Sequence, residues 1–246
     1  MPEKINQIIY TGLRAPDMLL EPDNKVKLYH HPTIRVDYDI KLEPQKVQDV
    51  LSQDCYPVFL SRNGVVGLNA WMQSSQTELS FQGKPIWSVG KQTSNEIRST
   101  LGVEAGEPLE QNAQGLIRLF KTIKPRPVVL FCAEDPRPDF PNWLKESGWS
   151  YKIFPVYRTL LVQNEDLAKR FDNSPNESII FTSPSTVMGF IKSLNLTDLR
   201  GVKSRLISIG PSTSETISQF SGKLYEEASE PDIRQLLKQI INEMGQ

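Results

Sequence analysis

Ser88-Val89-Gly90-Lys91-Gln92-Thr93-Ser94 returns later in the chain as Ser208-Ile209-Gly210-Pro211-Ser212-Thr213-Ser214. The segments stay in register, because an isoleucine follows each glycine by seven residues and a second glycine follows by twelve. Upstream, Val58-Phe59-Leu60-Ser61 resembles Ile180-Phe181-Thr182-Ser183. Downstream, Glu107-Pro108 and Glu230-Pro231 each precede an apolar helical pattern. A register sustained over about thirty residues favours an internal duplication.

Short apolar runs alternate with helical patterns along the chain. Buried strands are predicted at residues 8–10, 57–60, 86–89, 128–131, 178–181 and 205–209. Helices are predicted at residues 94–101, 113–121, 212–220 and 232–244. This alternation predicts parallel sheets with helices on both faces. We therefore expect two similar three-layer α/β domains.

Two segments break the pattern and suggest how the domains are joined. Residues 33–40 alternate apolar and polar side chains, which is typical of a strand with one solvated face, and residues 152–160 share this character. We interpret residues 33–41 and 152–162 as a two-stranded β connector. The predicted domains are then residues 1–32 with 163–246, which form a discontinuous α/β domain, and residues 42–151, which are inserted. The interdomain cleft is the expected ligand site.

Composition excludes several classes of protein. Lys plus Arg is 28 and Asp plus Glu is 29, giving a net charge of −1, so bulk charge does not favour binding to nucleic acid or to a membrane. The two cysteines cannot build a disulfide framework. The sequence shows neither a signal peptide nor an apolar run of about 20 residues. We expect a cytoplasmic protein.

Small and hydroxyl-bearing residues follow four predicted strands. A glycine or serine there leaves backbone N–H groups free at the start of a helix, which suits a carboxylate or a phosphate. Each turn alone is typical of an ordinary helix cap, but four such turns at the carboxyl ends of strands favour a ligand site. In one turn, either Ser183 or Ser185 can cap a helix whose first turn holds Pro184. The turns contain Ser61, Gly90 with Thr93, Ser183-Pro184-Ser185, and Gly210 with Ser212 and Thr213.

Other chemistry has little support in the sequence. No glycine-rich nucleotide motif is present, so binding of a dinucleotide or a nucleoside triphosphate has no support. His30 and His31 point to opposite sides of an extended chain and make a poor chelate, so we predict no metal site and no catalytic triad. The acidic, proline-rich residues 134–141 predict a rigid solvated loop. Cys132 is expected in the core.

Tyr157 lies in the predicted connector and admits two interpretations. Its hydroxyl could donate a proton or position a departing water at the cleft. Its ring could equally pack a hinge strand without taking part in chemistry. A ring facing the cleft would favour the first interpretation, and a ring buried within one domain would weaken it.

Several motifs, in their order and spacing, resemble the uroporphyrinogen-III synthase family. They are Phe181-Thr182-Ser183-Pro184-Ser185, Ser208-Ile209-Gly210-Pro211-Ser212-Thr213, Ala228-Ser229-Glu230-Pro231, Val156-Tyr157-Arg158-Thr159 and Val89-Gly90-Lys91-Gln92-Thr93. The resemblance covers essentially the whole chain. It implies a cofactor-free hydro-lyase of haem biosynthesis that closes hydroxymethylbilane into uroporphyrinogen III, inverting ring D and releasing water. It also implies a monomer, and it leaves open a transient contact with the preceding pathway enzyme.

The resemblance assigns roles to individual residues. Tyr157 matches the tyrosine thought to assist departure of the hydroxyl group. The substrate-binding positions it implies are Arg14, Ser61, Gly90, Lys91, Thr93, Ser183, Pro184, Ser185, Gly210, Ser212 and Thr213. The chain departs from the family at Leu60-Ser61-Arg62-Asn63, where Thr-Ser-Pro is usual, and at residues 133–139, which we expect not to bind substrate directly. The alternative is a non-catalytic two-domain module that binds a small anion in its interdomain cleft.

Overall fold

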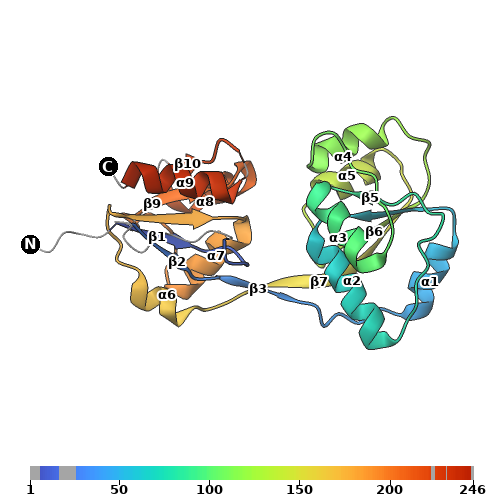
Figure 1. The fold of residues 1–246 in the computed structure, drawn as a ribbon, viewed down its shortest axis with the longest axis horizontal. Coiled ribbons are helices and arrows are strands. Elements are labelled where there is room, and N and C mark those ends of the chain that lie inside the picture. Colours follow the sequence, from blue (N-terminus) through green and yellow to red (C-terminus); the bar gives the residue numbers. More distant parts are fainter. Residues whose placement is uncertain (1–5, 17–25, 223–224, 231, 245–246) are drawn as a thin grey trace, which may run out of the picture. The chain divides into compact units, whose positions relative to one another are not determined.

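The computed structural model describes residues 6–16, 26–222, 225–230 and 232–244, which form two compact units. The split unit comprises Met1–Arg35 and Leu160–Gln246, and the inserted unit comprises Val36–Thr159. The chain passes from one unit to the other along strands β3 (Ile34–Asp37) and β7 (Tyr151–Leu161) (Figure 1). Within the described part of the chain, no helix combines the length and apolar character that a membrane span requires.

The split unit contains a sheet with the strand order β10-β9-β8-β1-β2, and its strand pairings are parallel. Its strands are β1 (Asn6–Tyr10), β2 (Val26–His30), β8 (Glu177–Phe181), β9 (Arg205–Ser208) and β10 (Glu226–Glu227). Its helices are α6 (Glu165–Arg170), α7 (Pro184–Ser193), α8 (Pro211–Ser221) and α9 (Ile233–Met244). The sequence did not predict β2 or α6.

The inserted unit contains a sheet with the order β3-β7-β6-β4-β5, in which β4, β5, β6 and β7 run parallel. Its remaining strands are β4 (Tyr56–Phe59), β5 (Trp87–Ser88) and β6 (Val128–Ala133). Its helices are α1 (Pro44–Ser52), α2 (Arg62–Ser75), α3 (Lys91–Leu101), α4 (Ala113–Phe120) and α5 (Asp139–Glu146).

Each sheet is covered on both faces. In β8, Ile179 packs with residues of α6, α7 and α8, whereas its neighbour Ile180 packs with α9. In β6, Phe131 packs with α1, α2 and α3, whereas Leu130 packs with α4 and α5. Successive strand residues point to opposite faces, so each strand supplies two apolar cores. The predicted three-layer α/β class with parallel sheets is confirmed.

The two sheets follow one plan. The order β9-β8-β1-β2 in the split unit matches β5-β4-β6-β7 in the inserted unit. Beyond β5, Gly106 forms a parallel bridge with Trp87, as Glu226 of β10 does with Ile207 of β9. In the split unit, β1 and β2 come from the N-terminal segment, whereas their counterparts β6 and β7 follow α4. The strand order therefore supports the duplication and explains why one copy is discontinuous.

Backbone geometry at the helix starts also repeats. Ser61, before α2, has φ −164° and ψ 161°, and Ser183, before α7, has φ −166° and ψ 161°. Gly90, before α3, has φ 168° and ψ 176°, and Gly210, before α8, has φ 167° and ψ 176°. The two serines therefore share one backbone conformation, and so do the two glycines.

One match within the predicted repeat is wrong. Ser94 Oγ donates to Glu107 Oε2 at 2.7 Å, and Ser214 Oγ donates to Glu227 in the same way. The counterpart of Glu107 is therefore Glu227, 120 residues later by subtraction of the two numbers, and not Glu230. The shared Glu-Pro dipeptide is a local likeness, whereas the serine contact fixes the structural equivalence. Pro231 lies outside the described residues.

Two predicted segments differ from the structure. The strand expected at residues 33–40 ends at Asp37, because Asp37 Oδ1 accepts from Asp39 N and Tyr38 O accepts from Ile40 N. These local bonds turn the backbone away from the sheet. The loop expected at residues 134–141 gives way at Asp139 to α5, which buries Phe140. Proline is tolerated in the first turn of a helix, so the prolines there do not prevent α5.

Candidate active site

The predicted turns lie at the carboxyl ends of parallel strands. In the inserted unit, Ser61 follows β4 and Gly90 follows the neighbouring β5. In the split unit, Ser183 follows β8 and Gly210 follows the neighbouring β9. Each pair of turns therefore lies at one edge of its own sheet, where open α/β sheets bind ligands.

Tyr157 and Ser61 form a hydroxyl pair in the inserted unit. Tyr157 Oη lies 3.0 Å from Ser61 Oγ, and either atom can be the donor. Ser61 Oγ also accepts from Gly64 N at 3.2 Å, which caps α2. If Tyr157 is the donor, the Ser61 hydrogen remains available for another acceptor.

The Tyr157 ring is mostly buried, with 9% of its surface exposed, and it packs in the core of the inserted unit. Burial raises the pKa of its hydroxyl, and the hydrogen bond with Ser61 partly opposes that rise. The hydroxyl is therefore protonated at neutral pH. A ring buried within one unit weakens the interpretation of Tyr157 as a group that itself contacts substrate. Its hydroxyl contacts Ser61 Oγ.

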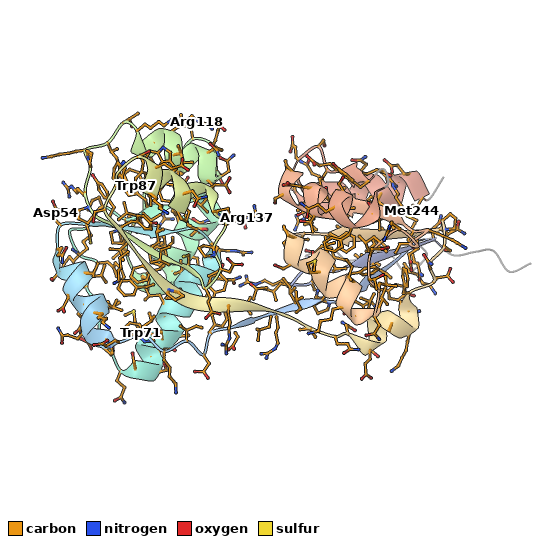
Figure 2. All side chains as sticks on the ribbon, turned by 180° about the vertical axis from the view of Figure 1, so that it is seen from behind. Asp54, Trp71, Trp87, Arg118, Arg137 and Met244 are labelled. Atoms are coloured by element: carbon orange, nitrogen blue, oxygen red, sulfur yellow. The ribbon has the colours of Figure 1, made fainter. Side chains whose placement is uncertain are left out.

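Sequence reasoning missed two residues near this pair. Tyr38 Oη donates to Asn63 Oδ1 at 3.0 Å, so a second tyrosine hydroxyl reaches the first turn of α2. The alternation of apolar and polar residues around Tyr38 was the feature of the sequence that could have pointed to this tyrosine. Arg137 is exposed and lowers the pKa of Tyr157 by its positive charge, and its side chain extends outward in Figure 2. Glu134 N donates to Tyr157 O at 2.8 Å, which ties the loop to β7, and the expectation that residues 133–139 do not bind substrate directly stays a prediction.

The Ser183 turn resolves an open alternative. Ser183 caps α7 by accepting from Thr186 N at 3.3 Å, and the Thr186 side chain completes a capping box. Ser185 is half-buried within the first turn, and Pro184 occupies the first helical position. The cap is therefore Ser183.

The two glycine turns have no capping side chain at the glycine itself. Their threonines do not line open space, because Thr93 is 4% exposed and Thr213 is 1% exposed. Lys91 is exposed and Ser212 is half-buried at the helix starts. What these turns can offer a ligand is thus chiefly backbone N–H groups and the lysine charge.

Arg14 lies on the turn after β1, the strand next to β8, and is exposed. His30 Nε2 lies 2.7 Å from Gly12 O and so holds this turn. Cys132 is buried, which raises the pKa of its thiol to about 12 and keeps it neutral. Among the residues that the structure describes, no three His, Cys, Asp or Glu side chains are grouped to hold a metal ion.

His31 should make stability depend on pH. Its Nε2 is buried without a hydrogen-bond partner among the described residues. Burial lowers its pKa, the Arg170 and His30 charges lower it further, and Asp166 opposes them. Below about pH 6.5, His31 is protonated in the unfolded chain but still neutral in the folded chain. The free energy of unfolding therefore falls as the pH drops through this range. We expect His31→Gln to flatten the decrease in Tm between pH 7.5 and 5.5. An unchanged slope would contradict this prediction.

Comparisons with known proteins identify the family. Residues 26–238 match the family model described as Uroporphyrinogen-III synthase HemD. No curated protein sequence matches the chain significantly.

Solved structures agree in fold. Uroporphyrinogen-III synthetase from Helicobacter pylori has a TM-score of 0.64 at 16% identity, over 96% of this chain and 99% of that one. A mutant uroporphyrinogen III synthase from Thermus thermophilus has a TM-score of 0.61 at 15% identity, over 97% and 99%. The family match spans well over half of the chain. The two solved structures match nearly the whole length of this chain and of their own chains. The chain therefore belongs to the uroporphyrinogen-III synthase family.

Proposed function

We propose that this protein converts hydroxymethylbilane into uroporphyrinogen III, inverting ring D and releasing one water as a hydro-lyase. The observation that carries the proposal is the family match over residues 26–238. No observation favours the alternative of a non-catalytic anion-binding module.

Substrate carboxylates, we infer, bind at the helix starts after Ser61, Gly90, Ser183 and Gly210. The substrate carries eight carboxylates while the chain has a net charge of −1, so binding depends on local geometry rather than bulk attraction. Helix N-termini supply oriented N–H groups and a favourable dipole for such anions. Among the described residues, the predicted binding positions include two exposed cations, Arg14 after β1 and Lys91 at the start of α3.

Tyr157 then assists departure of the substrate hydroxyl through Ser61. In this proposal Tyr157 Oη passes its proton to Ser61 Oγ as the Ser61 hydroxyl gives its own to the departing oxygen, which leaves as water. The proton that the unsubstituted α-carbon of ring D loses on reclosure later returns to Tyr157 through Ser61. The azafulvene cation that remains is attacked by the substituted carbon of ring D, and the spiro intermediate fragments and recloses with ring D inverted. The 3.0 Å distance between the two hydroxyl oxygens supports this relay.

Holding one conformer is the larger task. Free hydroxymethylbilane closes directly to the uninverted isomer, so the protein must position ring D for attack and prevent the direct closure. Such a task needs few catalytic side chains.

The test supplies freshly made hydroxymethylbilane and resolves the product isomers. We expect uroporphyrinogen III to form well above the uncatalysed rate. Formation of the uninverted isomer alone, at the uncatalysed rate, would show that the proposed function is wrong.

A further inference from the structure

One of the helix starts assigned to substrate is already covered by a side chain of the protein. Lys91 N, the first N–H of α3, donates to Gln111 Oε1 at 3.2 Å. A Cβ placed on Gly90 would lie 2.7 Å from Gln111 Cβ and 3.0 Å from Oε1. The Gln111 side chain therefore lies directly over the Gly90 turn.

The second copy lacks this cover. A Cβ placed on Gly210 would meet no atom within 4 Å among the described residues. The position 120 residues after Gln111 holds Pro231, which lies outside the described residues and whose side chain has no acceptor by its chemistry. Among the described residues, the two turns thus share one backbone conformation but differ in two respects. An amide oxygen covers the first turn, and the helix after the second turn begins with Pro211, which has no N–H to donate.

That amide oxygen accepts from the N–H group that an anion at this helix start would use. A carboxylate makes stronger hydrogen bonds to N–H donors than a neutral amide does, and a helix N-terminus favours negative charge. The first turn of α3 contains no acidic residue of its own. A substrate carboxylate can therefore displace the Gln111 amide. The Gln111 side chain is exposed and can adopt another rotamer.

We propose that Gln111 sets the affinity of the Gly90 turn for substrate, by holding Lys91 N–H until a substrate carboxylate displaces it. This proposal rests on the proposed function, because it takes the helix starts as carboxylate sites. It makes the two glycine turns unequal. The Gly210 turn binds its carboxylate through Ser212 N–H, because Pro211 has no N–H, and the Gly90 turn binds through Lys91 N–H only in competition with Gln111.

Kinetics of three variants test the competition. Gln111→Ala removes the cover and should lower KM for hydroxymethylbilane several-fold, whereas Gln111→Glu replaces it with a carboxylate and should raise KM several-fold. Both should leave kcat nearly unchanged. Gln114→Glu adds the same charge on the exposed surface of α4, three residues away, and should leave KM unchanged. Equal KM values for Gln111→Glu and Gln114→Glu would overturn the proposal.

A binding measurement separates this proposal from the function itself. Uroporphyrin III, the stable oxidised form of the product with the same eight carboxylates, is titrated while the Lys91 and Ser212 amide resonances are followed by NMR. In Gln111→Ala, the Lys91 amide should respond at lower concentration than in the unmodified protein, and the Ser212 amide at the same concentration.

The other outcomes are informative in different ways. If both amides respond alike in the two proteins, Gln111 does not compete and this proposal is overturned, while carboxylate binding at the turns stands. If neither amide responds in either protein, carboxylate binding at the helix starts is overturned as well.

Discussion

Replacing Ser61 by alanine should lower kcat for uroporphyrinogen III formation about 100-fold, the usual effect of losing a positioned proton donor. Ser61 is the hydroxyl through which the buried Tyr157 can act, because the two oxygens lie 3.0 Å apart and the tyrosine ring is 9% exposed. Tyr157→Phe removes only the hydroxyl that donates to Ser61 and leaves Ser61 itself in place. The kcat of this variant should therefore fall less, by about tenfold. The measurement is isomer-resolved turnover with fresh hydroxymethylbilane.

The serine also caps α2, so a control must separate capping from chemistry. Loss of a serine or asparagine cap costs about 1 kcal/mol of stability. Asn112 caps α4 in the same unit by accepting from Gly115 N at 2.8 Å. Asn112→Ala should therefore lower stability as Ser61→Ala does, while its kcat stays unchanged. If Ser61→Ala keeps more than half of the unmodified kcat, the hydroxyl relay is wrong.

The turns were predictable from sequence because their determinants are local. A short apolar run that ends in Ser61 or Gly90 and is followed by a helical pattern encodes both the strand and the helix start. The repeat was visible for the same reason, since Gly210 carries the same conformation as Gly90. The discontinuous plan followed from the repeat, although β2 was missed.

The remaining features depend on contacts between distant segments. Whether the Tyr157 ring is exposed or buried depends on helices that pack over β7, and a strand pattern with one solvated face does not encode them. Gln111 contacts Lys91, which lies twenty residues earlier in the chain, and the sequence around Gln111 does not indicate this contact. The pairing of Ser214 with Glu227 was hidden because a Glu-Pro dipeptide nearby gave the stronger local match.

Gly67→Ala should impair both stability and turnover. A Cβ on Gly67, in α2, would lie 2.2 Å from Val156 O, the carbonyl just before Tyr157 in β7. The backbone shift that relieves this clash should destabilise the folded state by about 3 kcal/mol. The higher helix propensity of alanine offsets about 1 kcal/mol of that loss. Because α2 must move away from β7, Ser61 should also separate from Tyr157. We expect a Tm about 5 °C lower and a kcat reduced about tenfold.

The duplicated fold supplies the matched control for that effect. Gly189 stands six residues after the Ser183 cap, as Gly67 does after Ser61, and a Cβ there would lie 2.1 Å from Thr33 O. Gly189→Ala should therefore lower stability by a similar amount but leave the Ser61–Tyr157 pair intact, so kcat should be retained. Because α7 starts at the Ser183 turn, a shift of α7 should raise KM rather than lower kcat. Gly201→Ala meets no atom within 4 Å among the described residues and should change neither quantity. If Gly67→Ala and Gly189→Ala reduce kcat equally, the loss reflects general destabilisation, and the link between α2 packing and the hydroxyl pair fails.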